Sequence, residues 1–78
     1  MVTWDIEVTD TFGGQANYDW VYRYAISIPG GISYLALVRR IKAAAGYSGI
    51  RGHTYVSGDF VEIRFPERCV VIFANVRY

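Results

Sequence analysis

Hydrophobic and polar residues alternate at the start of the chain. Between residues 2 and 9 every second side chain is apolar, namely Val2, Trp4, Ile6 and Val8. Successive side chains of a strand point to opposite faces, so this pattern predicts a half-buried β-strand. The polar stretch 10–17 contains Gly13-Gly14 and is typical of a hairpin loop. Residues 18–28 alternate again and predict the partner strand, whose apolar face would carry Tyr18, Trp20, Tyr22, Tyr24, Ile26 and Ile28.

The sequence Pro29-Gly30-Gly31 ends this strand, and the apolar spacing then becomes helical. We predict a helix over 32–45, with Gly31 or Ser33 as its N-cap. Its buried face would consist of Tyr34, Leu37, Val38, Ile41, Ala44 and Ala45. The small alanines at 43–45 should let the helix approach the aromatic rings of the second strand. Leu35 falls on the charged side of the helix, where it contacts either a loop or a partner.

The C-terminal half predicts three more strands. Residues 50–57 and 60–65 form a hairpin across Gly58-Asp59, a dipeptide suited to a tight turn. Pro66-Glu67 makes the next turn, and residues 68–77 form the last strand. This strand is the most apolar segment, so we expect it at the centre of the sheet.

These elements predict one α+β domain over residues 1–78, with the order ββαβββ. One helix packed on one face of a mainly antiparallel sheet of four or five strands is the natural two-layer arrangement. The chain has 78 residues, of which 53% are hydrophobic and 17% aromatic. Aromatic rings supply much apolar area per residue, which a thin core of this size needs.

Composition excludes several classes of protein. No apolar run approaches the length of a membrane-spanning helix, so we expect no membrane partner. The first residues lack the basic-then-apolar pattern of a signal peptide, and we expect a cytoplasmic protein. Cys69 is the only cysteine and His53 the only histidine. A disulfide within the chain is therefore impossible, and we predict no metal and no cofactor.

Basic residues cluster in the middle of the chain, although the net charge is only +1. Arg39, Arg40, Lys42 and Arg51 suggest nucleic-acid binding as an alternative function. Gly46-Tyr47-Ser48-Gly49 has the G-x-x-G spacing of the KH-domain clamp on a nucleic-acid backbone. That clamp needs a second helix after it, however, and residues 50–57 look like a strand. We therefore interpret Gly46 as a left-handed helix cap, and nucleic acid is not the expected main partner.

A catalytic alternative centres on His53. A two-residue turn at Gly58-Asp59 places Tyr55 opposite Glu62 and His53 opposite Arg64, on the face that would also carry Arg51. A cluster of His, Glu, Arg and Tyr is the inventory of a small metal-independent ribonuclease. Opposite charges across a strand pair are also an ordinary sheet stabiliser, and we predict that the protein is not an enzyme.

The sheet face that points away from the helix is the expected binding surface. The same counting puts Val61, Ile63, Val70 and Ile72 under the helix and turns Tyr55, Phe60, Cys69, Val71 and Phe73 away from it. With Arg51, Glu62 and Arg64 at the rim, this outer face has the apolar centre and charged margin of a protein interface. We expect Phe60, Val71 and Phe73 to be solvent-accessible and to bind a partner or a second copy. The alternative is that the loop 10–17, with Phe12, covers them.

Three segments, "LVRRIKAAAGYSGIRG", "GDFVEIR" and "CVVIFA", resemble small accessory proteins of phages and prophages. The resemblance covers about half of the chain and includes no catalytic signature. Such proteins often bind and block host machinery, and anti-CRISPR proteins are one such class. The resemblance implies a non-catalytic protein-binding module that inhibits a bacterial defence complex. Its interface would be the outer face or the helix edge formed by Leu35, Arg39, Arg40 and Lys42.

Overall fold

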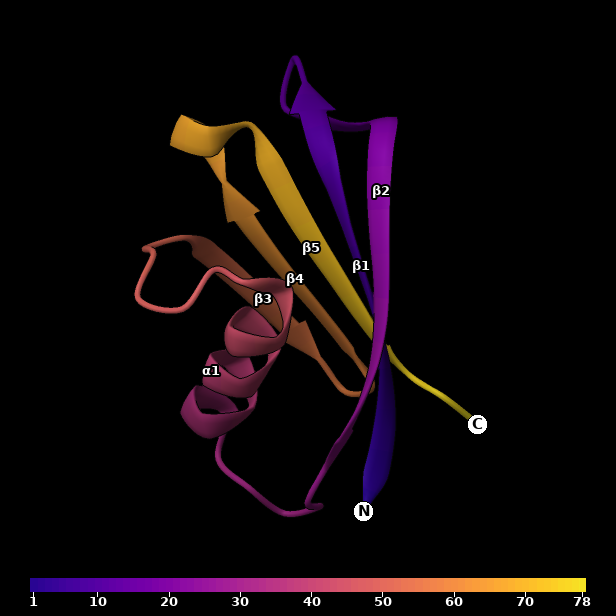
Figure 1. The fold of residues 1–78 in the computed structure, drawn as a ribbon. Helices are drawn as coiled ribbons and strands as arrows, with labels where there is room; N and C mark the ends of the chain where they lie inside the picture. Colours follow the sequence, from indigo (N-terminus) through magenta and orange to yellow (C-terminus); the bar gives the residue numbers. More distant parts are fainter.

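The computed structural model describes all 78 residues as one helix packed on a five-stranded antiparallel sheet (Figure 1). This confirms the predicted α+β fold and its element order. The strands and helix are β1 (Val2–Phe12), β2 (Gln15–Ile28), α1 (Tyr34–Ala45), β3 (His53–Ser57), β4 (Phe60–Phe65) and β5 (Val70–Val76), with a 3-10 turn, η1 (Pro66–Arg68), before β5. No helix of the protein is both long enough and apolar enough to cross a membrane.

The strand order in the sheet is β2-β1-β5-β4-β3. The apolar last strand, β5, therefore lies in the centre, as its composition predicts, although it is shorter than the predicted 68–77. The long strand β2 and the short strand β3 form the two free edges. The segment 50–52, predicted as the start of a strand, is irregular.

The β1–β2 hairpin is longer than the sequence indicates. Only Gly13 and Gly14, both at positive φ, form its turn, so the predicted loop 10–17 is wrong. The register between the two strands shifts between Thr9 and Thr11, and Tyr18 opposite this shift has a φ of 57°. This β-bulge hides the strand signal, because the extra residue interrupts the alternation of apolar and polar side chains.

Both ends of α1 follow the expected capping chemistry. The Ser33 hydroxyl accepts a hydrogen bond from the backbone N–H of Ala36, 3.2 Å away, which fixes the helix start two residues later than predicted. Gly46 ends the helix with a φ of 84°, which confirms that it is a left-handed cap. No second helix follows it, so the arrangement of a KH domain is not formed. Tyr34, predicted on the buried face, is 68% exposed.

The core lies between α1 and one face of the sheet. Its buried residues are Trp4, Ile6, Val8, Ile28, Leu37, Ile41, Ala45, Val61, Ile63, Phe65, Val70, Ile72 and Ala74. The predicted assignment of faces in β4 and β5 is thus confirmed. The turn between these strands spans four residues and not two, because Phe65 pairs with Val70. The face assignment is unchanged, since both turns have an even number of residues and leave each side chain on the same face.

The helix covers only part of the sheet face on which it packs. α1 has 12 residues and β2 has 14. The helix is about 18 Å long, whereas the molecule is 35 Å long along its longest axis. The distal half of the β1–β2 hairpin therefore extends beyond the helix (Figure 1).

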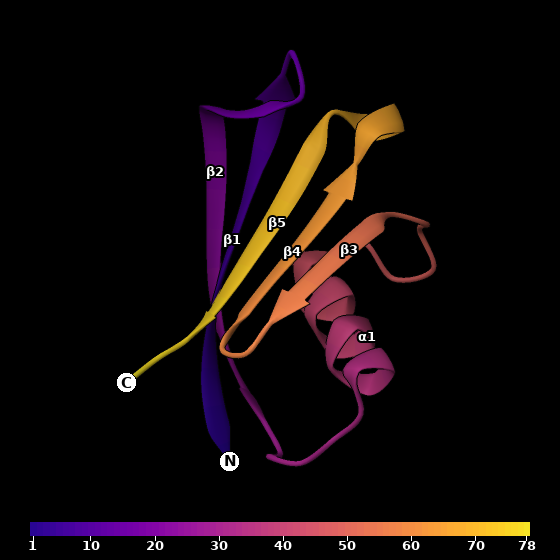
Figure 2. The same ribbon diagram turned by 180° about the vertical axis from the view of Figure 1, so that it is seen from behind.

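The outer face of the sheet, in front in Figure 2, is held together by ion pairs. Glu7 pairs with Arg23 at 3.3 Å, Glu62 with Arg64 at 2.8 Å, and Asp5 with Arg77. The Glu7–Arg23 pair links β1 to β2, and Arg77 links the end of the chain to Asp5 on β1, whereas Glu62 and Arg64 both lie on β4. The hydrogen bond that Arg77 donates lowers the pKa of Asp5. The face is thus more polar than a bare apolar sheet surface.

Val71 is fully buried on this outer face, so its predicted accessibility is wrong. The tip of the β1–β2 hairpin lies near it, because Arg64, which pairs with Val71 across the strands, donates a hydrogen bond from Nη1 to the Gly14 carbonyl. The hairpin tip is thus tied to the outer face through Arg64. Phe12 does not take part, since it is 79% exposed.

Candidate functional site

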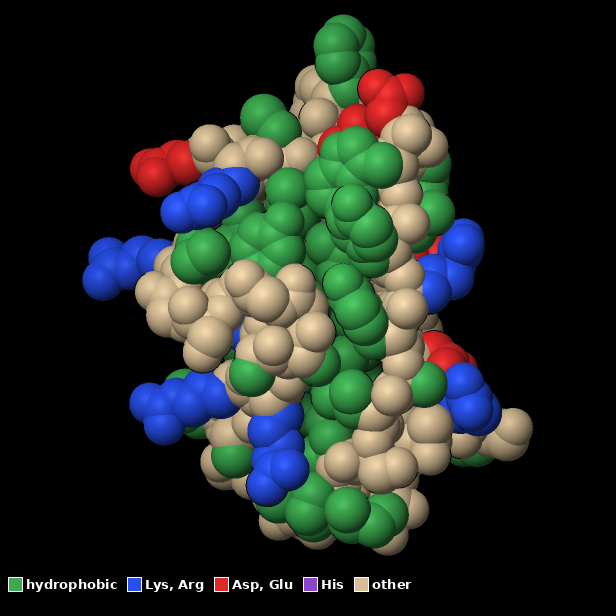
Figure 3. Space-filling view, viewed as in Figure 1, with side chains coloured by type: hydrophobic (Ala, Val, Ile, Leu, Met, Phe, Trp, Pro, Cys, Tyr) green, Lys and Arg blue, Asp and Glu red, His purple; other side chains and the backbone are tan.

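Three neighbouring exposed rings of β2 lie on the helix side of the sheet. Trp20, Tyr22 and Tyr24 occupy alternate positions of β2 and point to the face that α1 covers only in part. They are 37%, 60% and 39% exposed. With Tyr47 from the segment after α1, we call them the aromatic surface. Figure 3 shows hydrophobic side chains gathered in one continuous area between α1 and β2.

The aromatic surface joins segments that are distant in the sequence. Tyr47 stacks on the buried ring of Phe65 with a centroid distance of 5.0 Å and an interplanar angle of 22°. Burial raises the pKa of Tyr47, and the hydroxyls of Tyr24 and Tyr22 raise it further. The positive charge of Arg68 offsets part of this rise.

Five of the eight basic residues form no salt bridge, and they all lie in or after α1. They are Arg39, Arg40, Lys42, Arg51 and Arg68. Lys42 lies over the ring of Phe65, with its Nζ 5.8 Å from the centroid, and Arg68 lies near Tyr47. The aromatic surface thus has two cations at its margin, while the other three lie farther along the helix and the segment that follows it.

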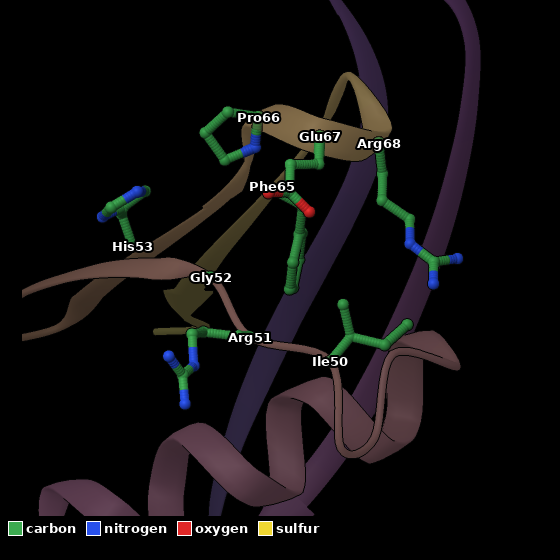
Figure 4. A pocket seen from close by; sticks show the side chains of 8 residues that line it. All are labelled: Ile50, Arg51, Gly52, His53, Phe65, Pro66, Glu67 and Arg68. Atoms are coloured by element: carbon green, nitrogen blue, oxygen red, sulfur yellow. The ribbon is translucent and has the colours of Figure 1, made fainter.

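The helix edge predicted as an interface lies beside residues 48–51, which follow the helix cap. Leu35, Arg39, Lys42 and Arg51 line one open cleft between α1 and residues 48–51, with a volume of about 550 Å³. Arg40 is not among the lining residues. Figure 4 shows the side chain of Arg51 pointing toward α1, so its predicted place at the rim of the outer face is wrong.

The side chains proposed for ribonuclease activity have the predicted register. His53 pairs with Arg64, and Tyr55 with Glu62. Arg64 is held by Glu62 and by the Gly14 carbonyl, so its guanidinium is already occupied. A cleft of about 430 Å³ includes His53, Arg51 and Arg68, but in Figure 4 these three side chains point in different directions. This geometry does not bring a base, an acid and a phosphate-binding group to one point.

The remaining candidates of the outer face form a small, half-buried cluster. The rings of Phe60 and Phe73 lie 6.2 Å apart and are partly covered, whereas Tyr55 on the edge strand is 58% exposed. Cys69, predicted on this face, instead ends η1 in a left-handed conformation with a φ of 52°. No group of three or more His, Cys, Asp or Glu side chains is arranged to hold a metal ion.

The lengths of the predicted elements contain a signal for the aromatic surface, whereas the assignment of side chains to faces does not. Alternation places Trp20, Tyr22 and Tyr24 on the helix side and suggests that the helix covers them. The predicted lengths, 14 residues for the helix over 32–45 and 11 for the strand over 18–28, already indicate a helix of about 21 Å on a strand of about 36 Å, so the helix can cover only part of the strand.

Comparison with known proteins returns no match, whether with family models, with curated proteins or with solved structures. The function is therefore argued from the site itself.

Proposed function

We propose that the protein is a non-catalytic protein-binding module whose partner docks on the aromatic surface. The observation that carries this proposal is the exposure of Trp20, Tyr22 and Tyr24 side by side on a sheet face that the chain's own helix leaves open. Exposed apolar areas with a polar rim are typical of interaction sites in small proteins.

The composition of the aromatic surface supports a protein partner. Trp, Tyr and Arg are the residues that most often dominate the binding energy of protein interfaces. Tyr and Trp offer large contact areas with few rotatable bonds, so ordering them on binding costs little entropy. Arg68 and Lys42 at the margin favour a partner that presents carboxylates around an apolar centre.

Single-stranded nucleic acid is the competing partner, because rows of aromatic rings also stack on bases. The ring geometry of β2 favours this less. Trp20 and Tyr22 are tilted by 42° with centroids 5.5 Å apart, so the two rings pack on each other and do not present parallel faces.

The host-defence form of this proposal rests on the sequence resemblance alone. Small phage accessory proteins act by occupying a surface of a host complex, and a rigid aromatic surface on a small domain is suited to that role. The partner would then be a bacterial defence complex, and the protein would act by steric blocking without any chemical step.

The test compares two exposed tyrosines of nearly equal accessibility. Tyr22 is 60% exposed on the helix side, and Tyr55 is 58% exposed on the outer face. Tagged wild type, Tyr22→Ser and Tyr55→Ser are used to capture proteins from a bacterial lysate, followed by a titration against the captured protein. Truncating a central interface residue costs about 2 kcal/mol or more, so we expect Tyr22→Ser to weaken binding about 30-fold and Tyr55→Ser to change it little.

The reverse pattern overturns the choice of surface. If Tyr55→Ser loses the partner and Tyr22→Ser retains it, the outer face with Phe60 and Phe73 is the interface. Capture of nucleic acid without any specific protein would overturn the proposal of a protein partner. Circular dichroism of both variants checks that the fold is intact.

A further inference from the structure

The strand β2 leaves an open backbone edge next to the aromatic surface. It lies at the end of the sheet order and pairs only with β1. From Val21 to Ile28 this pairing is regular, and the segment contains neither proline nor lysine. Natural edge strands are usually protected by such residues, by bulges or by brevity, because an open edge is a template for another strand. In β2 the bulge protects only the end near Tyr18.

The hydrogen bonds of β1 show which backbone groups of β2 are free. The Thr3 carbonyl accepts from Arg77 and the Thr11 N–H donates to Cys69, so odd-numbered residues of β1 face β5. Because these groups alternate along an antiparallel strand, even-numbered residues of β1 face β2. Their partners in β2 are also even-numbered, since Val8 pairs with Tyr22 and Ile6 with Tyr24.

The free groups on β2 therefore belong to its odd-numbered residues. In the regular stretch these are Val21, Arg23, Ala25 and Ser27, whose N–H and C=O groups point away from the sheet. They form a continuous row of donors and acceptors, and an antiparallel strand can satisfy them without any change in the rest of the fold.

We propose that two copies of this chain pair through their β2 strands, antiparallel and two-fold symmetric, to form one ten-stranded sheet. This interface is distinct from the proposed docking of a partner, since it uses the edge of β2 and leaves the ring faces of the aromatic surface open. A second copy is the favoured occupant because the sequence of β2 is complementary to itself.

The side chains are most self-complementary in the register centred on Tyr22, in which Val21 and Arg23 of one copy exchange hydrogen bonds with Arg23 and Val21 of the other. The pairing ends at Ala25, because Asp19 opposite it already donates its N–H to Asp10. Tyr22 then lies opposite Tyr22 of the second copy, and Trp20 lies opposite its Tyr24, so that each exposed ring has an aromatic neighbour across the new pair. Asp19 lies diagonal to Arg23 of the second copy, and this opposite-charge contact occurs twice by symmetry. A register centred on Arg23 would place two guanidinium groups opposite each other, which is unfavourable.

Sedimentation velocity of the full chain over a range of concentrations, with Cys69→Ser as the background, tests the dimer. Arg23→Pro removes an N–H that points to the free edge and not to β1, so it blocks the Val21–Arg23 hydrogen bonds of the new pairing and leaves the hydrogen bonds of the hairpin in place. Tyr22→Lys places two ammonium groups opposite each other and serves as a second variant. We expect a concentration-dependent dimer for the background protein and a dissociation constant raised about tenfold or more in each variant. Tyr55→Lys, at an equally exposed position on the opposite face, should leave the dimer unchanged.

Disulfide trapping tests the register in the same background. In the non-hydrogen-bonded pair formed by Tyr22, the Cα atoms would be about 4.5 Å apart, within the range of a disulfide. Tyr24→Cys would place its two thiols four residues apart along the strands, about 13 Å, which is too far. We expect a covalent dimer from Tyr22→Cys and none from Tyr24→Cys. Trapping by Tyr24→Cys alone would overturn this register. A background protein that remains monomeric at about 200 µM would overturn the dimer and leave the edge to a strand from another protein.

Discussion

Gly52 lies where the segment after α1 passes close to β4. A Cβ atom at this position would be 2.8 Å from the Arg64 carbonyl oxygen and 2.9 Å from the Phe65 ring. Backbone and a buried ring cannot move aside easily, so we expect Gly52→Ala to destabilise the protein by about 1–3 kcal/mol. Denaturant unfolding measures the change. Gly30→Ala is the control, because its Cβ would meet only a Val2 methyl group at 3.9 Å. Equal stability of the two variants would contradict the close approach.

Phe73 sits between two carboxylates on the outer face. In the register of the sheet it lies opposite Glu7 on β1 and Glu62 on β4. Phe73→Asp would add a third carboxylate, whereas Phe73→Lys would add a cation of opposite sign. Both variants lose the contact with Phe60, so the difference between them reports the charge environment. We expect Phe73→Lys to be more stable by about 1 kcal/mol at pH 7, measured by denaturant unfolding at low salt. Phe73→Asp as the more stable variant would contradict the register.

Side-chain direction could be predicted from the sequence, but burial on the outer face could not. Val71 faces away from the helix as predicted, yet it is fully buried. It lies in the central strand β5 between Thr9 and Arg64, and the Arg64 side chain reaches the Gly14 carbonyl of the hairpin tip. A contact between residues 50 positions apart in the sequence leaves no periodic signal. Alternation indicates only which side chains lie on the same face of the sheet.

At the level of elements, the β1–β2 hairpin depends on a polar cluster at its bulge. The Thr9 hydroxyl, fully buried, donates to the Trp20 carbonyl at 2.8 Å and accepts from the Tyr18 N–H at 3.1 Å. The Asp10 carboxylate accepts from the Asn17 side chain and from the Asp19 N–H, both at 2.9 Å. These bonds satisfy backbone groups that the register shift removes from the ladder.

The Asp10 carboxylate makes the stability of this hairpin depend on pH. The hydrogen bond from Asn17, supported by the backbone N–H groups, lowers the pKa of Asp10 below the ordinary value of 3.8. A lowered pKa in the folded state means that the contribution is fully present above pH 3.8 and is lost as the pH falls through the folded-state pKa. We expect the stability difference between wild type and Asp10→Asn to shrink as the pH falls from about 6 to about 2. Denaturant unfolding at each pH measures it.

A constant difference between wild type and Asp10→Asn would contradict this role of the carboxylate. Asp5→Asn is not a neutral control, because Arg77 lowers the pKa of Asp5 in the same direction. Asp59→Asn, in the turn between β3 and β4, is the better comparison, since that carboxylate makes no salt bridge.

The elements themselves could largely be predicted, because periodicity and capping residues are local signals. Ser33 and Gly46 fix the helix ends, and Gly58-Asp59 gives the β3–β4 register. The bulge at Tyr18 could not be predicted, since its cause is the set of hydrogen bonds from Thr9 and Asp10 on the neighbouring strand. The loop predicted over 10–17 is wrong for that reason.

At the scale of the whole molecule, a helix shorter than the strands it covers determines where the apolar surface is exposed. The sequence predicts which residues face the helix, but not how far along β2 the helix reaches. Trp20 and Tyr22 lie beyond it, while the predicted outer face carries ion pairs, and its Phe60 and Phe73 are half-buried. The candidate site thus moves from Phe60 and Phe73 to the aromatic surface.

The charge distribution of the molecule limits nucleic-acid binding. Five basic residues form no salt bridge, and they are spread between the cleft beside α1 and the margin of the aromatic surface. Contact with all five would give a log–log salt slope of about −3.5 for a single strand, so ordinary salt should abolish the binding. Fluorescence anisotropy with a labelled oligonucleotide at several salt concentrations tests this. Micromolar or tighter binding at physiological salt would contradict it.

Site-specific photocrosslinking in bacterial cells tests the role of the aromatic surface most directly. A photoreactive phenylalanine derivative replaces Tyr22 in one variant and Tyr55 in another, two positions of nearly equal exposure on opposite faces of the sheet. Our account predicts an adduct with a foreign protein from position 22, together with a self-adduct of twice the chain mass, and neither from position 55. Adducts from position 55 with none from position 22 would contradict it and assign the interface to the outer face.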